Sequence, residues 1–455
     1  MISHTDHIRS KLANGPATAR QVFEKIGISQ PTFSRAILAM GHEIVQIGAD
    51  KAIQYSIRDK RRGLEDIPIY RIDVDGKIKA LGVLVAVCPD GFVMQQANGV
   101  GLHSDSLPWW LFDMRPQGFL GRAFALKYAS VLGLSTRLSD WSDAHVLRAL
   151  VAHGLDLVGN LLLGDAARER FLNLSPPTPI LVSAKGGTYA RLAKEVSSGD
   201  VAGSSVGGEQ PKFTAFVETP DGPCHVLVKF SLLDTTPLSG SASNSVIERW
   251  RDLLLAEHLA LETLADSGFL AARSCVIDHG GQRFLEVKRF DRVGAVGRRA
   301  VFSLTCVDAE FVGNGIASWP VIATQLANDG HITQACAASV ALLYAFGVLI
   351  GNTDMHNGNL AFMSDHGHPY ALSPAYDMLP MGFAPQSSGE IRTKLLSANL
   401  HASVSNVVWV EALSLATAFL GRAKAESRFS DGFSACLDAL ACHIDAASEK
   451  IARLA

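Results

Sequence analysis

The chain has 455 residues, enough for two or three domains, so a single small module is excluded. Hydrophobic residues make up 48% and charged residues 19%, which is ordinary for a globular protein and argues against long disordered or fibrous segments. The net charge of −3 excludes a protein that binds nucleic acid or anionic lipid over its whole surface. Any such partner needs a local basic patch.

The sequence predicts a cytoplasmic protein with no membrane partner. The seven cysteines form no C-x-x-C pair and no metal-ligand spacing, which is typical of reduced thiols. Residues 1–11 are too polar for the apolar core of a secretory signal. The uncharged stretch 332–352 carries Thr333, Gln334 and Ser339, and its apolar part is shorter than the ~20 residues that a span needs, so we expect a buried helix there.

Residues 1–62 carry ten basic and five acidic side chains, a net charge of +5 against −8 for the rest of the chain. Thr18 is a predicted N-cap of a helix that ends at Gly27, and Ser29 is a predicted N-cap of a second helix with Pro31 in its first turn. The segment 44–57 alternates around Gly48 as a small β-wing would. This order predicts a winged helix-turn-helix domain over 1–62.

The second of these helices would turn its apolar residues inward and leave polar residues outward. The outward residues have side chains of the types that contact base edges and phosphates, which predicts DNA binding. They are Gln30, Thr32, Ser34 and Arg35. The alternative is a small helical packing domain with a solvated face. Helix-turn-helix proteins commonly pair to contact two half-sites, so a homodimer is a further expectation left open.

The next region, 67–180, is predicted to be β-rich and to follow a linker at 61–63. Residues 67–96 alternate like strands with turns at 75–76 and 90–91, and helical segments follow at 118–132 and 142–150. The proline-rich run 175–179 ends the region.

A glycine-rich segment, 202–212, contains G-x-S-x-G around Ser205, the spacing of a serine hydrolase elbow. An elbow lies between an apolar strand and a helix, whereas polar residues precede this segment and 213–217 is strand-like. With a second strand at 226–230, the pattern favours a hairpin whose loop lays backbone N–H groups over phosphates. Walker A spacing is absent, which excludes a P-loop NTPase.

Lys229 lies in an otherwise apolar strand, and Glu257 lies on the apolar stripe of the helix that follows. A buried carboxylate is costly unless it is paired, so the two are predicted to meet. A strand lysine that meets a helix glutamate beside a glycine-rich loop is the kinase arrangement, in which the lysine holds nucleotide phosphates. The alternative is a lysine that extends to solvent and a glutamate on a solvated edge.

A polar loop and a second aspartate follow the apolar helix. Phosphoryl transfer to a hydroxyl needs a base and oxygen ligands for Mg²⁺, which kinases supply from an Asp, an Asn five residues later and an Asp beyond a hairpin. Asp354, Asn359 and Asp377 have this order. A plain turn is the alternative for the loop by itself. His356, His366 and His368 could form a metal site with Asp354, but no second ligand set of the right spacing appears, which favours a turn-ordering role for His356.

Four motifs in order resemble the HipA family of bacterial toxin-type serine/threonine kinases. They are SVGGEQPK at 205–212, VKRFDR at 287–292, DMHNGN at 354–359 and YD at 376–377. The similarity spans about Pro68 to the C-terminus. It implies an α+β chain in which a small β-rich kinase N-lobe at 181–292 is followed by a mostly helical C-lobe at 293–455.

The resemblance also implies roles for individual residues. Asp354 would be the catalytic base in a catalytic loop with His356 and Asn359, and Asn359 and Asp377 would hold Mg²⁺. Lys229, paired with Glu257, would contact ATP. Lys288 and Phe290 would hold adenine at the hinge through backbone groups. The glycine loop would cover the phosphates, and its residues are Ser205, Val206, Gly207, Gly208, Gln210 and Lys212.

Ser205 matches the serine that family members autophosphorylate to switch the kinase off, with Ser204 as the neighbouring alternative. The implied substrate is a protein serine or threonine, in family precedent on an aminoacyl-tRNA synthetase, and the implied partners include an antitoxin. Two features depart from the family. Lys288 stands where the family often has an acidic residue, and Pro211 removes one N–H donor from the loop.

The leading hypothesis is an ATP- and Mg²⁺-dependent protein kinase fused to a DNA-binding domain that regulates its own operon. A second is a DNA-binding regulator whose kinase fold senses nucleotide with weak or no activity. A third is a phosphotransferase acting on a small hydroxylated molecule. A serine hydrolase acting through Ser205 is the last alternative.

Overall fold

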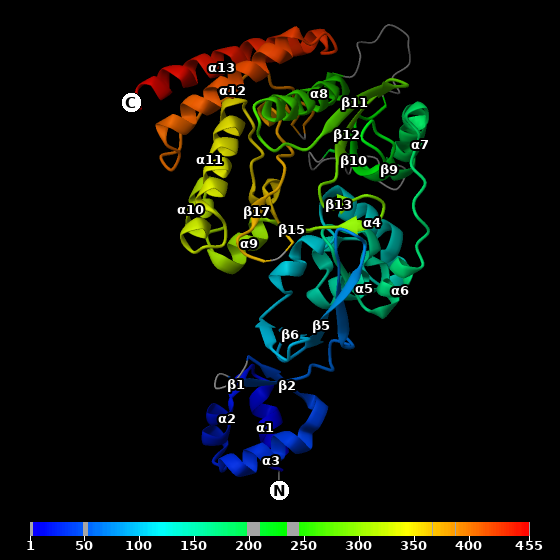
Figure 1. Ribbon diagram of the computed structural model, residues 1–455, viewed down its shortest axis with the longest axis vertical. Coiled ribbons are helices and arrows are strands. Elements are labelled where there is room, and N and C mark those ends of the chain that lie inside the picture. The colour runs from blue at the N-terminus through cyan, green and yellow to red at the C-terminus, as the bar shows by residue number, and fades with distance from the viewer. Residues whose placement is uncertain are drawn as a thin grey trace. The chain divides into compact units, whose positions relative to one another are not determined.

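The computed structural model describes residues 3–48, 53–197, 210–233, 245–365, 367–386 and 388–454. The chain divides into two compact units, one formed by 1–116 with 124–175 and the other by 117–123 with 176–455 (Figure 1). The glycine-loop residues Ser205, Val206, Gly207 and Gly208 lie outside the described residues, so their predicted roles stay predictions. No helix among the described ranges is long and apolar enough to cross a membrane.

The first unit begins with three helices and a small sheet. Thr18 caps the second helix, Gly27 ends it with φ 75°, and Ser29 caps the third, as predicted. The first helix was not predicted, although Ser3 and Asp6 form its capping box. The elements are α1 (His4–Leu12), β1 (Ala17–Thr18), α2 (Ala19–Ile26), α3 (Gln30–Met40), β2 (Ile44–Ile47) and β3 (Gln54–Ile57), with strand order β1-β3-β2.

The rest of this unit is a five-stranded antiparallel sheet with helices, as predicted for the β-rich region. Its core joins both sheet and helices, for example Phe92 on a strand and Leu147 on a helix. The strands are β4 (Ile67–Ile72), β5 (Ile78–Ala86), β6 (Phe92–Gln96), β7 (Gly101–Ser104) and β8 (Leu161–Leu163), in the order β7-β6-β5-β4-β8. The helices are α4 (Gly118–Leu132), α5 (Asp143–His153) and α6 (Asp165–Leu172).

The residues predicted to form a linker, 61–63, are held in place by side-chain hydrogen bonds. Buried Asp59 accepts hydrogen bonds from Arg61 and Arg62. Arg62 also donates to the carbonyls of Val87 and Gly91 in the turn between β5 and β6 of the adjoining sheet. Nearby, Val45 and Ile47 of β2 pack into a small core with Val85, Val87 and Val93. One face of β2, in the segment predicted to form a wing, is therefore buried against the sheet.

The second unit begins with a four-stranded antiparallel sheet between two helices. One face carries an aromatic core under α7 that includes Tyr189, Phe213 and Phe284, and the other face is covered by α8. Both predicted hairpin strands are present, and β9 shows that a strand follows the G-x-S-x-G sequence. The elements are α7 (Lys185–Ser197), β9 (Lys212–Val217), β10 (Cys224–Phe230), α8 (Ser245–Asp266), β11 (Ser274–His279) and β12 (Gln282–Lys288), with strand order β11-β12-β10-β9.

The remainder of this unit is mostly helical, with two small sheets. The uncharged stretch predicted as a buried helix forms α11, whose N-cap is Thr333. The strands are β13 (Arg292–Val293), β14 (Gly297–Arg298), β15 (Ala300–Ser303), β16 (Ala361–Ser364) and β17 (Ala371–Leu372). The helices are α9 (Leu304–Phe311), α10 (Trp319–Asn328), α11 (Gln334–Leu349), α12 (Asn406–Ala425) and α13 (Ser434–Ala452).

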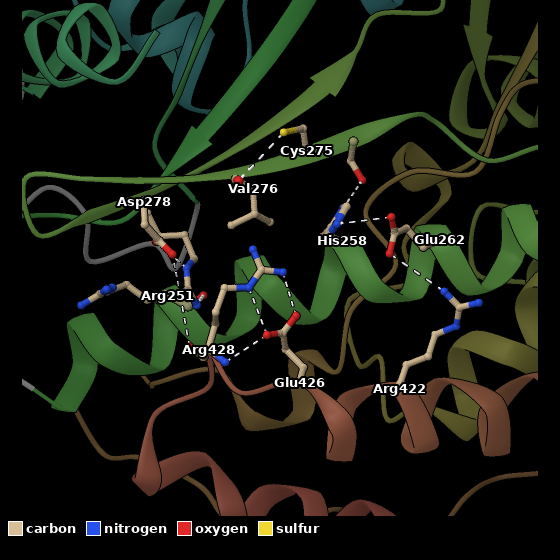
Figure 2. Close-up of polar contacts among 11 residues, drawn as sticks. Arg251, His258, Glu262, Cys275, Val276, Asp278, Arg422, Glu426 and Arg428 are labelled. Carbon is tan, nitrogen blue, oxygen red and sulfur yellow. Dashed lines mark hydrogen bonds and ion pairs between the residues drawn. The ribbon is translucent and has the colours of Figure 1, made fainter. Parts of the chain in front are cut away.

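Helix α8 is tied to this helical part near both of its ends. Near its start, buried Arg249 donates to the carbonyls of Phe383 (3.0 Å) and Arg392 (2.8 Å), and Asp252 accepts from the backbone N–H of Ser430 (2.9 Å). Near its end, Glu262 and Asp266 both form ion pairs with Arg422 of α12. Figure 2 shows Glu262 and Arg422 with the neighbouring Glu426–Arg428 pair.

His258 on the same helix should make the folding stability of the protein depend on pH. Its Nδ1 lies 2.8 Å from Ser274 Oγ, and its Nε2 lies 3.5 Å from Glu262 (Figure 2). Burial lowers the pKa of His258, and the charge of Glu262 only partly opposes this. The unfolded chain therefore binds the proton more readily, and folding stability falls as pH drops through the ordinary histidine range. In urea unfolding, we expect His258→Gln to lose less stability than wild type between pH 7.5 and 5.5; parallel losses would contradict this.

Candidate functional site

The site is built around a buried ion pair on the α8 face of the four-stranded sheet. Lys229 Nζ lies 2.7 and 2.8 Å from the two carboxylate oxygens of Glu257, and the two residues are 5% and 1% exposed. Val226, Val228 and Phe230 of the same strand face the other core, so the alternation of β10 points Lys229 at the helix. The prediction that these two residues meet is confirmed.

Asp377 is the second carboxylate on Lys229, and its Oδ1 contacts the Lys229 ammonium. Burial opposes ionisation of Asp377, but the positive charges of Lys229 and Lys212 outweigh burial and lower its pKa. Burial likewise opposes the charge on Lys229, yet Asp377 and Glu257 raise its pKa above the ordinary value. Lys229 and Asp377 are therefore both held in their charged forms, whereas burial raises the pKa of Glu257.

The backbone of Asp377 is also unusual. Its φ is 53°, and among the described residues it is the only non-glycine with positive φ. This left-handed conformation is costly for a residue with a side chain and persists only where the surroundings enforce it. Such strain is concentrated at functional sites, which marks Asp377 independently of its motif.

Two predicted glycine-loop residues fall within the described part of the chain. Lys212 lies directly opposite Lys229 across the β9–β10 pair, which puts two cations side by side on the α8 face. Gln210 is turned to the strand instead, because its Nε2 donates to the carbonyl of Phe230 at 2.7 Å. Lys212 is therefore part of the site, where its positive charge acts on Asp377. The side chain of Gln210 instead holds the start of β9 against β10.

The polar loop between α11 and β16 is ordered by its own side chains. Asn359 Nδ2 donates to the carbonyl of Asp354 at 2.7 Å, which leaves the amide oxygen of Asn359 as the atom able to bind a cation. His356 Nδ1 accepts the N–H of Gly358 at 3.0 Å, the turn-ordering role that the sequence favoured. Asp354 and His356 are both exposed, so a substrate can reach them.

Two residues connect this loop to Asp377. Buried Asn352 accepts the N–H of Asp354 at 3.0 Å through Oδ1 and donates to the carbonyl of Asp377 at 3.3 Å through Nδ2. Tyr376 donates its hydroxyl to the carbonyl of Gly358 at 2.9 Å. Neither residue was predicted to have a role of its own. The signal that could have revealed Asn352 is an Asn that directly follows an apolar helix and precedes the polar loop.

The predicted hinge residues lie at the end of β12. Phe290 is half-buried and its ring centre lies 5.6 Å from that of Tyr376. Lys288 is exposed, and its N–H is donated to the carbonyl of Arg273 at 2.8 Å. A nucleotide base at this position would therefore have to bind groups other than the Lys288 N–H.

The donor set fits a hard divalent cation. The amide oxygen of Asn359 and the carboxylate of Asp377 are oxygen ligands of the kind that Mg²⁺ prefers, and Mg²⁺ usually takes only one or two protein ligands beside phosphates and water. Within the described residues no group of three or more His, Cys, Asp or Glu side chains could hold a metal by itself. Two protein ligands of this kind are consistent with a cation site whose remaining ligands are oxygen atoms of a bound phosphate and of water.

The residues predicted to contact DNA lie in the first unit, on α3. Gln30, Ser34 and Arg35 are exposed and Thr32 is half-buried, with its hydroxyl 2.9 Å from that of Ser29. The outward orientation predicted for this helix is present, while Thr32 belongs to the capping turn.

Asn352 provides a test of how the loop is positioned. Asn352→Ala removes the acceptor for the Asp354 N–H and the donor to the Asp377 carbonyl, and we expect a loss of stability of about 1–3 kcal/mol because both groups lose a buried partner. If the site is catalytic, the rate should fall on the order of 100-fold, because small misplacements of reacting groups are costly. Thermal unfolding and a single-turnover rate measure the two effects, and an unchanged rate would exclude a positioning role.

Comparison with known proteins identifies the family. Residues 204–440 match the HipA-like C-terminal domain, and residues 64–172 match the YjjJ-like toxin middle domain. The chain is 37% identical over 445 residues to Toxin YjjJ of Escherichia coli strain K12, covering 97% of this chain and 98% of that protein. The chain belongs to the HipA family of toxins, which confirms the resemblance predicted from its four motifs.

Solved structures also match. One is HipA of the Shewanella oneidensis MR-1 toxin–antitoxin system in complex with HipB and operator DNA, with 14% identity, a TM-score of 0.48, and 85% of this chain and 97% of that chain covered. Another is the Helicobacter pylori proinflammatory kinase CtkA, with 13% identity, a TM-score of 0.34, and 54% of this chain and 92% of that chain covered.

Proposed function

We propose that the chain is a toxin of the HipA type that transfers phosphate from ATP to a serine or threonine of a protein. The observation that carries the proposal is the contact of Lys229 with both Glu257 and Asp377, two carboxylates that come from distant parts of the chain. A lysine between a helix glutamate and a metal-binding aspartate is the arrangement that kinases need. An aminoacyl-tRNA synthetase remains a proposed substrate by family precedent.

Each residue has a role in the proposed reaction. Lys229 and Lys212 hold nucleotide phosphates, and Glu257 keeps Lys229 in place. The Asn359 amide oxygen and the Asp377 carboxylate would hold Mg²⁺, which would neutralise charge on the phosphates. Asp354 accepts the proton of the substrate hydroxyl, and Asn352 and Asn359 fix the backbone of Asp354 for that step.

The test is incubation of the purified chain with γ-labelled ATP and Mg²⁺, followed by intact-mass analysis and peptide mapping. A phosphate on Ser205 or Ser204, absent when EDTA replaces Mg²⁺, is the expected result. Ser205→Ala and Ser204→Ala assign the position. Retained ATP binding with no phosphorylated product would instead support a nucleotide-sensing regulator, the second function considered.

The proposal includes DNA binding by the first unit, with an antitoxin and a second copy of the chain as further proposed partners. The local charge of +5 and the exposed polar residues of α3 support it, and the buried wing leaves α3 as the element that would enter a major groove. The proposed setting is the cytoplasm, where operator DNA and the protein substrate are present.

Arg35→Ala tests this interface. Loss of one phosphate contact should weaken binding to the DNA upstream of the chain's own coding sequence and reduce the slope of log K against log salt by about 0.9. Arg20→Ala on α2 is a matched control, since Arg20 is exposed and ion-paired with Glu24. Electrophoretic mobility shifts over a salt series give both slopes, and equal effects of the two variants would argue against α3 as the DNA-binding helix.

A further inference from the structure

A cavity of about 650 Å³ lies beside the polar loop of the candidate site. Helix α9 and the segment that follows it form one part of its lining, and the residues directly after Asp354 form another. The lining consists of Thr305, Asp308, Ala309, Gly313, Gly315, Ile316, Ala317, Met355, His356 and Asn357. The roles proposed so far use neither this cavity nor its acidic residue.

Asp308 is the acidic residue of the cavity and is only 3% exposed. One carboxylate oxygen, Oδ1, accepts the backbone N–H of Asn314 at 3.0 Å. Within the described ranges, no Lys, Arg or His forms an ion pair with Asp308. A buried carboxylate without a cationic partner is expensive. A cationic ligand in the cavity would therefore supply the Asp308 carboxylate with the partner it needs.

The other walls of the cavity suit the stem of a long basic side chain. Ala309, Ala317 and Met355 are apolar, and Ile316 is fully exposed at 101%. Gly315 has no side chain and lies beside the Asp308 carboxylate, since a Cβ there would be in ordinary van der Waals contact with Oδ2 at 3.8 Å. Lysine and arginine place methylene groups along apolar surface and a charge at the tip, which matches this combination.

We propose that the Asp308 cavity is a subsite for a lysine or arginine side chain of the protein substrate. Because Met355, His356 and Asn357 line it directly after Asp354, the basic residue lies within a few positions of the phosphorylated serine or threonine. This rests on the proposed kinase function and narrows its substrates to basic peptide segments. The negative Asp308 disfavours acidic segments at the same position.

The alternative role of Asp308 is to anchor the end of α9 through Asn314. Asp308→Asn separates the two, because the amide oxygen of Asn still accepts the Asn314 N–H while the charge is lost. Glu310→Gln is the matched control, since Glu310 is an exposed acid on the same helix that is not part of the cavity lining. Thermal unfolding is used to check that both variants are folded.

The first experiment phosphorylates positional-scanning serine/threonine peptide mixtures with γ-labelled ATP. Wild type and Glu310→Gln should prefer Lys or Arg over norleucine at one flanking position by about tenfold or more in kcat/KM, and Asp308→Asn should lose this preference. Autophosphorylation in the glycine loop should be the same in all three. Equal use of basic and norleucine peptides by wild type, with autophosphorylation intact, would overturn the subsite and leave the kinase proposal standing.

The second experiment does not depend on catalysis. The methyl signals of methionines labelled with ¹³C are followed by NMR while Nα-acetylarginine methylamide is added, and Met355 is assigned from the spectrum of Met355→Leu. The Met355 signal should shift with added ligand in wild type and Glu310→Gln, and much less in Asp308→Asn. A Met355 signal that does not respond in wild type overturns the subsite, whatever the kinase assay shows.

Discussion

Asp354→Ala is expected to lower phosphate transfer by roughly 10²- to 10⁴-fold, the contribution typical of a positioned general base. Asp354→Asn should behave alike, because the amide cannot accept the substrate proton. ATP binding should be retained in both variants, since Asp354 would act on the hydroxyl and not on the nucleotide. Single-turnover transfer from γ-labelled ATP measures the rate, and fluorescence titration with a nucleotide analogue measures binding.

Asp365→Asn is the control for Asp354, because Asp365 is an exposed acid at the end of β16, beyond the loop. It should leave the transfer rate within about twofold of wild type, as an exposed substitution away from special features usually does. Transfer that survives in Asp354→Ala would remove Asp354 from the proposed mechanism. The nucleotide-sensing alternative would then gain weight if binding also persisted.

Lys229→Met is expected to cost about 3–5 kcal/mol of folding stability, because it leaves Glu257 buried without its cation. Transfer activity should be lost as well, since the phosphate contact is gone. The double variant Lys229→Met/Glu257→Leu removes both charges and should recover most of the stability while remaining inactive. Urea unfolding measures the free energy of unfolding, and the Ser205 assay measures activity at concentrations where each variant is folded.

A second buried pair on the opposite face of the same sheet offers a matched control. Lys185 Nζ lies 2.8 Å from Glu286, whose carboxylate also accepts the hydroxyl of Tyr189. Lys185→Met should destabilise the sheet by a similar amount, yet the folded fraction should keep its activity because α7 faces away from the site. Equal loss of activity in Lys185→Met and Lys229→Met would mean that Lys229 matters only for stability.

The sequence predicted the features that depend on short-range patterns. Thr18, Ser29 and Gly27 mark helix ends through local hydrogen bonds and backbone preferences, so α2 and α3 appear where expected. The meeting of Lys229 and Glu257 could be predicted as well, because each lies on an apolar face where a charge needs a partner.

Other features depend on contacts between residues far apart in the chain, which periodicity does not reveal. Arg62 was expected in a linker, but its partners are carbonyls 25 to 29 residues away. Asn352 donates to a carbonyl 25 residues later, and Asp308 lines a cavity only once α9 lies beside the polar loop. Capping pairs can also be overlooked, as the Ser3–Asp6 box of α1 was.

The ties of α8 to the helical part decide which motions the unit can make. To move the helix outward, the chain would have to release the Arg249 guanidinium from two carbonyls and Asp252 from Ser430, groups that are buried and hydrogen-bonded. Amide protons along the middle of α8 should accordingly exchange with solvent as slowly as those of β10, with or without nucleotide. A compound that binds in the space left by a displaced α8 would therefore have no site in this protein. Inhibitors should be sought among compounds that bind while the Lys229–Glu257 ion pair is formed.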